Sequence, residues 1–183
     1  MLINRDREKL LHAVAFFAEN VDKCGKIKLF KLLYFLDFEH YKLTGRSVTG
    51  MDYFAWKMGP VPKDLYEEIK APKPDLSDFM DINEKEVSMG KMLDFRIKKK
   101  FNSDLFSKRE LKIMNSLASK YYRTKAGEMI EETHLENLPW HRIYEVEKKS
   151  GEKIPYELAF RRQEYDEMVR IAKDHKEVIN SLS

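Results

Sequence analysis

The segment KLFKLLYFLDF, residues 28–38, limits the possible folds more than any other part of the chain. Eight of its eleven residues are apolar, and at 3.6 residues per turn these side chains point to every side of a helix. A helix that is apolar all round has to be covered by neighbours on all sides. We therefore expect a helix from about Lys26 to Leu43 to form the buried centre of the domain, with Gly45 as its left-handed cap.

Six further helices are expected around this one. Apolar residues at spacings of three and four follow the first of them, the sequence SKRE places a capping box at Ser107, and proline can occupy the first turn of two others. In chain order they are expected at Asp6–Glu19, Pro62–Ile69, from Ser107 to about Tyr121, in TKAGEMIEETH, in PWHRIYEVEKK from Pro139, and at about Phe160–Leu182.

Two segments resemble strands instead. MDYFAW precedes the turn at Gly59-Pro60, which predicts a strand, a turn and a short helix. Apolar Leu93, Phe95 and Ile97 alternate with polar residues, which is typical of a half-buried strand. The fold class expected is mainly α (α+β): a compact helical domain around a buried central helix, with a small antiparallel sheet. The 183 residues fit a single domain.

Composition excludes several classes of protein. The net charge of +3 comes from 34 basic and 31 acidic residues, so no strong field attracts nucleic acid or a membrane. The longest apolar run has six residues, at 13–18, against roughly 20 for a membrane span. A single cysteine, Cys24, rules out an internal disulfide. Together with the missing signal-peptide pattern it favours a cytoplasmic protein.

The residues most able to act as ligands or nucleophiles do not form a known motif. They are His12, His40, His134, His141 and Cys24. None has the spacing that places two ligands on one metal ion, and the lone thiol has no evident base. We expect no metal, no cofactor and no catalytic residues, and we expect His134 to pack or hydrogen-bond near Trp140.

Two tryptophans and three lysines have positions that permit either a structural or a binding role. Trp56 and Trp140 stand beside Gly-Pro or Pro, where a large aromatic side chain most often packs a turn onto the core. Lys28, Lys31 and Lys57 adjoin dense apolar segments, so we expect their charged ends to reach solvent or an acidic partner.

Three separated segments, KLFKLLYFLDFEHYKLTGRSV, FAWKMGPVPKDLY and EETHLENLPWHRIY, resemble the Panacea antitoxin domain, a SocA-like or phage-associated family of small bacterial and phage proteins. Their order and spacing also agree with that family. The matching positions are Lys28, Leu29, Lys31, Leu32, Tyr34 and Phe35; then Trp56, Lys57, Gly59, Pro60, Val61, Leu65 and Tyr66; then Thr133, His134, Pro139 and Trp140.

The resemblance covers about residues 8–145 of a single domain spanning 1–183, and leaves a C-terminal helical extension at about 148–183. It implies a non-enzymatic antitoxin that binds and neutralises a toxin protein encoded by an adjacent gene. It also implies, as an alternative, an adaptor that presents the toxin to a cellular protease. The candidate partner-binding residues are Lys28, Lys31, Tyr34, Trp56, Lys57, Gly59, Pro60, Tyr66, Thr133, His134 and Trp140.

Two readings from other classes stay open. The basic residues Arg96, Lys98, Lys99 and Lys100 could contact phosphates in a nucleic-acid-associated regulator, although basic side chains on a strand also guard its edge. No helix-turn-helix is expected before residue 8. An enzyme that uses His134 is the weaker reading, and bound metal or cofactor would support it.

Overall fold

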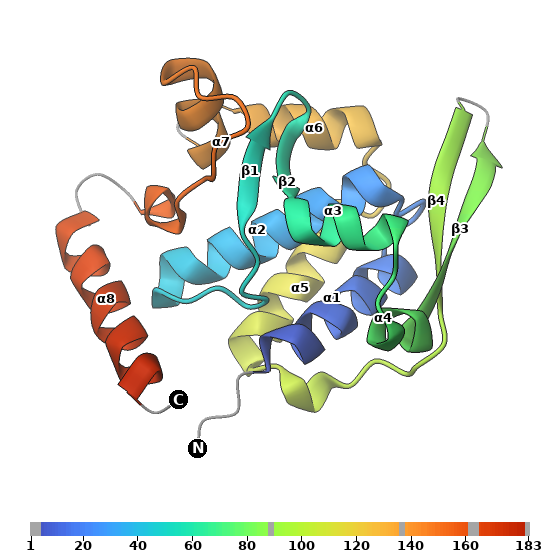
Figure 1. The fold of residues 1–183 in the computed structure, drawn as a ribbon, viewed down its shortest axis with the longest axis horizontal. Helices are drawn as coiled ribbons and strands as arrows, with labels where there is room; N and C mark the ends of the chain where they lie inside the picture. The colour runs from blue at the N-terminus through green and yellow to red at the C-terminus, as the bar shows by residue number, and fades with distance from the viewer. Residues whose placement is uncertain (1–4, 88–89, 136–137, 161–164, 182–183) are drawn as a thin grey trace.

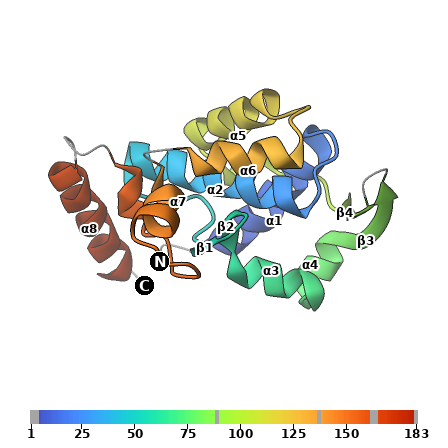
Figure 2. The ribbon, with the colours of Figure 1, turned by 90° about the horizontal axis from the view of Figure 1, so that it is seen from above.

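The computed structural model describes residues 5–87, 90–135, 138–160 and 165–181. Its centre is α2 (Lys26–Thr44), in which every residue from Lys28 to Phe38 is buried. Helices α1 (Asp6–Asn20), α5 (Lys108–Lys120) and α6 (Ala126–His134) pack against α2. Figure 2 shows α5 on one side of α2 and the β1–β2 hairpin on the other. The prediction of a buried central helix is confirmed.

The helix ends follow the local sequence signals. Gly45 adopts a left-handed conformation with φ of 70°, and its N–H donates to the Tyr41 carbonyl at 2.7 Å. At the start of α5, the Ser107 side chain accepts from the Glu110 N–H, and the Glu110 carboxylate accepts from the Ser107 N–H. Both predicted caps are therefore present.

The strands form two separate antiparallel pairs rather than one small sheet. β1 (Tyr53–Trp56) and β2 (Gly59–Pro62) form a tight hairpin against α2, in register from Tyr53–Pro62 to Trp56–Gly59. β3 (Met80–Val87) and β4 (Gly90–Ile97) form a longer ribbon that extends away from the helices (Figure 1). The expected alternation on β4 is confirmed, because Phe95 is buried and Leu93 and Ile97 are half-buried, while Asp94 and Arg96 between them are exposed.

Several short helices connect these elements. They are α3 (Lys63–Lys70), α4 (Pro74–Phe79), η1 (Ser103–Leu105), α7 (Pro139–His141), the π-helical turn η2 (Arg142–Val146) and η3 (Tyr156–Ala159). The composition of the sequence APKPDLSD is typical of a loop, yet part of it belongs to α4. Pro74 stands in the first turn of that helix, where its missing N–H costs nothing. Leu76 and Phe79 are buried and hold α4 on the core.

The chain after Lys148 is not helical from its start. Residues 151–154 run beside β1: the Ala55 N–H donates to the Glu152 carbonyl at 2.9 Å, and the Ile154 N–H donates to the Tyr53 carbonyl at 2.8 Å. Helix α8 (Tyr165–Ser181) follows only after η3. Ile154, at 1% exposure, belongs to the main core.

A buried carboxylate holds the chain that leaves α2. Asp37 accepts hydrogen bonds from the Val48 N–H, the Thr49 N–H and hydroxyl, and the Tyr53 hydroxyl, at 2.5–2.8 Å. Burial raises the pKa of Asp37, against the effect of these donors. An acidic residue directly after the apolar run LLYFL is the available sequence signal, but its partners lie 11–16 residues away along the chain.

Candidate functional site

The three motif segments meet in space at one cluster of residues. Lys31 comes from α2, Gly59 and Pro60 begin β2, and Thr133 stands near the end of α6. The Lys31 Nζ donates a hydrogen bond to the Pro60 carbonyl at 2.8 Å. A Cβ atom on Gly59 would lie 2.6 Å from the Lys31 Nζ and 2.7 Å from the Thr133 Oγ1. The close approach of three elements therefore requires glycine at residue 59.

Lys31 is buried without a carboxylate partner. Its exposure is 2%, and none of the ion pairs in the described part of the chain involves it. Burial lowers the pKa of its ammonium group to about 7. The expectation that this charged end reaches solvent is wrong, because β2 and α6 cover it.

Lys28 and Lys57 differ in whether the charged end of the side chain is buried. Lys28 is only 4% exposed, and its Nζ donates to the carbonyls of Asp22 at 2.7 Å and Tyr122 at 3.2 Å. Its ammonium therefore joins two loops instead of reaching an acidic partner, and burial lowers its pKa. Lys57 is exposed at the tip of the β1–β2 hairpin, as predicted.

Three aromatic rings stack beside this point. The His134 ring lies parallel to Trp140 with centroids 3.7 Å apart, and Tyr144 stacks on Trp140 at 4.7 Å. The Trp140 Nε1–H donates to the Trp56 carbonyl at 2.9 Å. The predicted packing of His134 near Trp140 is confirmed. We call Lys31, Gly59, Pro60, Thr133, His134 and Trp140 the motif cluster.

The two tryptophans have different positions. Trp140 is 1% exposed and is among the largest fully buried side chains, which confirms its expected place in the core. Trp56 is half-buried, and its ring meets the Tyr66 ring edge-on at 5.0 Å. The core prediction therefore holds fully for Trp140 and only in part for Trp56, because Trp56 contributes its carbonyl to the cluster and leaves part of its ring at the surface.

Two buried polar atoms of this region lack a well-formed hydrogen bond within the described residues. One is the His134 Nε2. Burial, followed by the charge of Lys31, lowers the pKa of that imidazole. The other is the Tyr34 hydroxyl, which ends against the backbone of Trp140.

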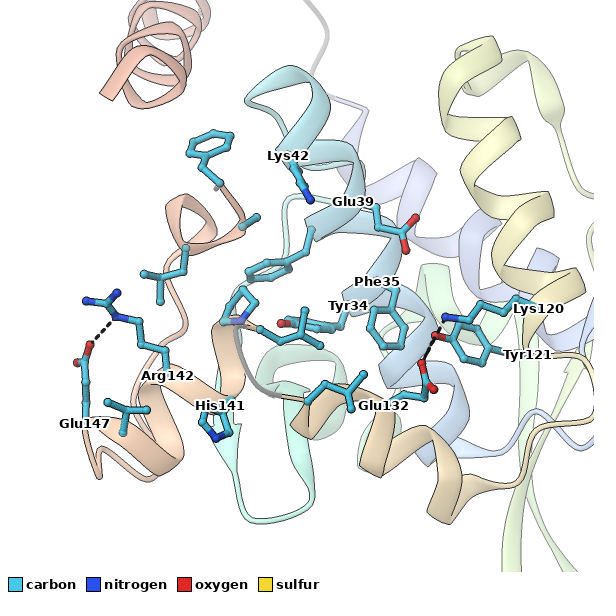
Figure 3. A pocket seen from close by; sticks show the side chains of 18 residues that line it. Tyr34, Phe35, Glu39, Lys42, Lys120, Tyr121, Glu132, His141, Arg142 and Glu147 are labelled. Atoms are coloured by element: carbon cyan, nitrogen blue, oxygen red, sulfur yellow. Dashed lines mark hydrogen bonds and ion pairs between the residues drawn. The ribbon is translucent and has the colours of Figure 1, made fainter. Parts of the chain in front are cut away.

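A groove of about 970 Å³ opens beside the motif cluster. Figure 3 shows the side chains that line it. Tyr34, Phe35 and Phe38 of α2 line it, and the ring of Phe35 stacks on Tyr121 at 5.5 Å. The other residues that line the groove are Glu39, Lys42, Lys120, Glu132, Leu135, Leu138, Pro139, His141, Arg142, Val146, Glu147, Leu158, Ala159 and Phe160. Of the candidate residues from the sequence, Tyr34 belongs to this groove.

The groove combines exposed apolar side chains with paired charges. Leu135 is 54% exposed and Val146 is 66% exposed. Lys120 pairs with Glu132 at 3.3 Å, and Arg142 pairs with Glu147 at 3.2 Å. Local sequence patterns could not identify this surface, because its residues come from several elements and their exposure depends on the tertiary arrangement.

The remaining candidates for chemistry lie apart from one another. Cys24 is buried, and burial raises the pKa of its thiol to about 12, which disfavours the reactive thiolate. The His12 Nδ1 accepts from the Asn102 N–H, and the His40 ring lies 2.7 Å from the Arg46 carbonyl. Within the described residues, no three His, Cys, Asp or Glu side chains are placed to hold a metal ion.

The basic segment around β4 is partly neutralised. Lys98 pairs with Asp81 at 2.9 Å, and the Lys99 ammonium lies 5.9 Å from the centre of the Phe79 ring. Arg96 and Lys100 are exposed. Acidic Glu84 and Glu86 on β3 mix the signs of charge on the same ribbon, which weakens the attraction of phosphates.

In the part of the chain that is described, no helix has the length and apolar character needed to cross a membrane.

Comparison with known proteins identifies the family. Neither curated proteins nor solved structures give a match. A family model, antitoxin SocA-like, Panacea domain, matches residues 29–141, which is more than half of the chain and contains the motif cluster. The chain belongs to the family of SocA-like antitoxins with a Panacea domain.

Proposed function

We propose that this protein is a non-enzymatic antitoxin that binds a toxin protein, encoded by an adjacent gene, and blocks it sterically. Membership of the antitoxin family supports the general role. The observation that carries the specific proposal is the groove, where Leu135 and Val146 remain exposed beside an aromatic floor. Apolar side chains in a concave surface gain free energy when a partner covers them.

The composition of the groove supports binding of a protein. Tyr34, Phe35 and Phe38 provide an apolar centre, and two ion pairs stand among its lining residues. An apolar centre inside a polar rim is common where two proteins bind each other. Binding would cover the toxin surface in contact with the groove, and no bond has to be made or broken.

The motif cluster has a supporting role in this proposal. Its Lys31, Gly59 and Thr133 are buried and hold α2, β2 and α6 together. Since α2 and α6 also line the groove, the cluster fixes the position of these two helices relative to each other and so the shape of the groove. We propose that it positions the binding surface and does not itself contact the toxin.

Co-expression with the product of the adjacent gene tests the proposal. We expect growth to be rescued by the wild-type protein, and we expect the two proteins to purify together at constant toxin level. A lack of both rescue and complex would overturn the proposal. Rescue accompanied by loss of the toxin, with recovery of the toxin in a protease-deficient host, would favour the adaptor alternative. Salt-sensitive binding to nucleic acid without any complex would favour the regulator.

A further inference from the structure

Two parts of the chain form the groove, one inside the family match and one outside it. The residues contributed by α2, α5 and α6 fall inside the family match at 29–141. Arg142, Val146 and Glu147 lie beyond it, as does the segment from Leu158 to Phe160. One part of the groove lining therefore lies within the residues that the family model matches, and the other part lies outside them.

The part beyond the match begins with an unusual backbone. In η2 (Arg142–Val146) the Glu147 N–H donates to the Arg142 carbonyl, five residues earlier, at 2.9 Å. Such π-helical turns insert an extra residue into a helix and occur often at functional sites. Here the turn ends with Val146, a β-branched apolar residue that is 66% exposed in the groove.

The charges of the groove are balanced. Glu39, Glu132 and Glu147 line it together with Lys42, Lys120 and Arg142. Four of these six residues form two ion pairs, Lys120 with Glu132 and Arg142 with Glu147 (Figure 3). A balanced lining offers little attraction to a strongly charged ligand. It is complementary to a partner segment whose contact face is apolar and whose flanks carry both signs of charge.

The size of the groove fits a short stretch of helix. Two helical turns, roughly 10 Å across and about 11 Å long, occupy on the order of 850 Å³, compared with about 970 Å³ for the groove. We infer that the groove receives an amphipathic helix of the toxin, whose apolar side chains pack on Phe35, Leu135 and Val146. This inference depends on the proposed function, and the wall formed by η2 and η3 selects which helix fits.

Photo-crosslinking tests this contact directly. A photoreactive phenylalanine analogue replaces Leu135 or Val146, and in a matched control it replaces Met58, which is 53% exposed at the hairpin tip. Each variant is co-expressed with the adjacent gene product. We expect crosslinks from Leu135 and Val146 to one toxin segment that carries apolar residues at helical spacing. Crosslinks from Met58 alone, or to a segment with strand alternation, would overturn the inference.

Charge insertion provides an independent measurement. Leu135→Glu and Val146→Glu should each weaken toxin binding ten-fold or more, while Leu135→Met and Met58→Glu should leave it within about two-fold. The thermal transition of all four variants should stay close to that of the wild type, because these side chains are exposed. Equal binding by the wild type and both groove variants would exclude this groove. If the wild type itself fails to bind or rescue, the proposed function fails, and the inference fails with it.

Discussion

The motif cluster and the groove lie side by side on α2 but differ in almost every physical property. The cluster buries Lys31 at 2% exposure and Trp140 at 1%, whereas the groove leaves Leu135 and Val146 more than half exposed. The residues by which the family can be recognised in the sequence are therefore mainly those that hold the elements together. The groove that we propose as the toxin-binding surface lies next to them and is formed partly by residues outside the family match.

Charge separates the two regions as clearly as burial does. In the motif cluster, the Lys31 ammonium has a carbonyl partner and no ion pair within the described chain. In the groove, Lys120 and Arg142 pair with carboxylates at 3.2–3.3 Å in contact with solvent. Substitutions in the cluster should therefore change folding and its pH dependence, and substitutions in the groove should change binding.

The largest expected effect is that of Trp140→Ala. Removing this fully buried ring and its hydrogen bond to the Trp56 carbonyl should lower the free energy of unfolding by about 3–5 kcal/mol. Trp56→Ala should cost clearly less, because that ring is half-buried. Denaturant unfolding of both variants measures the difference. Equal losses would mean that the hairpin turn depends on the Trp56 side chain as much as on its carbonyl.

Gly59→Ala should have the next largest effect. Gly59 has φ of +95°, and the new methyl group would press on the Lys31 Nζ and the Thr133 Oγ1. We expect a loss of about 2–3 kcal/mol from strain and overpacking together. Gly151→Ala is the matched control, because Gly151 also has positive φ, +82°, but open space around its Cβ position. It should lose only about 1 kcal/mol, the cost of the backbone conformation alone, and equal losses in denaturant unfolding would contradict close packing at residue 59.

Lys31→Met should change the pH dependence of stability. The pKa of Lys31 is about 7 in the folded protein and about 10.4 in an unfolded chain. Between these values the unfolded state binds more protons, so Lys31 makes the wild type more stable as pH rises from 7 toward 10. Unfolding curves across pH 7–9 should show a wild-type slope steeper than that of the variant by up to about 1.4 kcal/mol per pH unit. Parallel slopes would show that the ammonium is hydrated.

The smallest effect on stability is expected for Lys57→Glu. This side chain is exposed at the hairpin tip, so the free energy of unfolding should change by less than about 0.5 kcal/mol. If the groove is the binding surface, toxin neutralisation should also persist. Loss of neutralisation in a fully folded Lys57→Glu variant would move the partner surface to the hairpin, since charge reversal across an interface costs association free energy.

Local sequence signals are enough to predict the central helix of this protein and the ends of its helices. Eight apolar residues in KLFKLLYFLDF leave a helix no exposed face, and Gly45 and Ser107 specify helix ends through interactions a few residues away. The family resemblance is also recognisable from the sequence, because each of its three motifs is a continuous stretch of residues. Each of these signals lies within one short segment, so it can be recognised without knowledge of the fold.

Which polar groups are buried, and where the groove forms, depends on the tertiary arrangement. Lys31 is buried because β2 and α6 cover it, and Asp37 is satisfied by residues that return 11–16 positions later. The groove needs α2, α6, η2 and η3 to meet, and Val146 lines it at the end of the π-helical turn η2. Burial and concavity are properties of several segments at once, so no pattern within one segment encodes them.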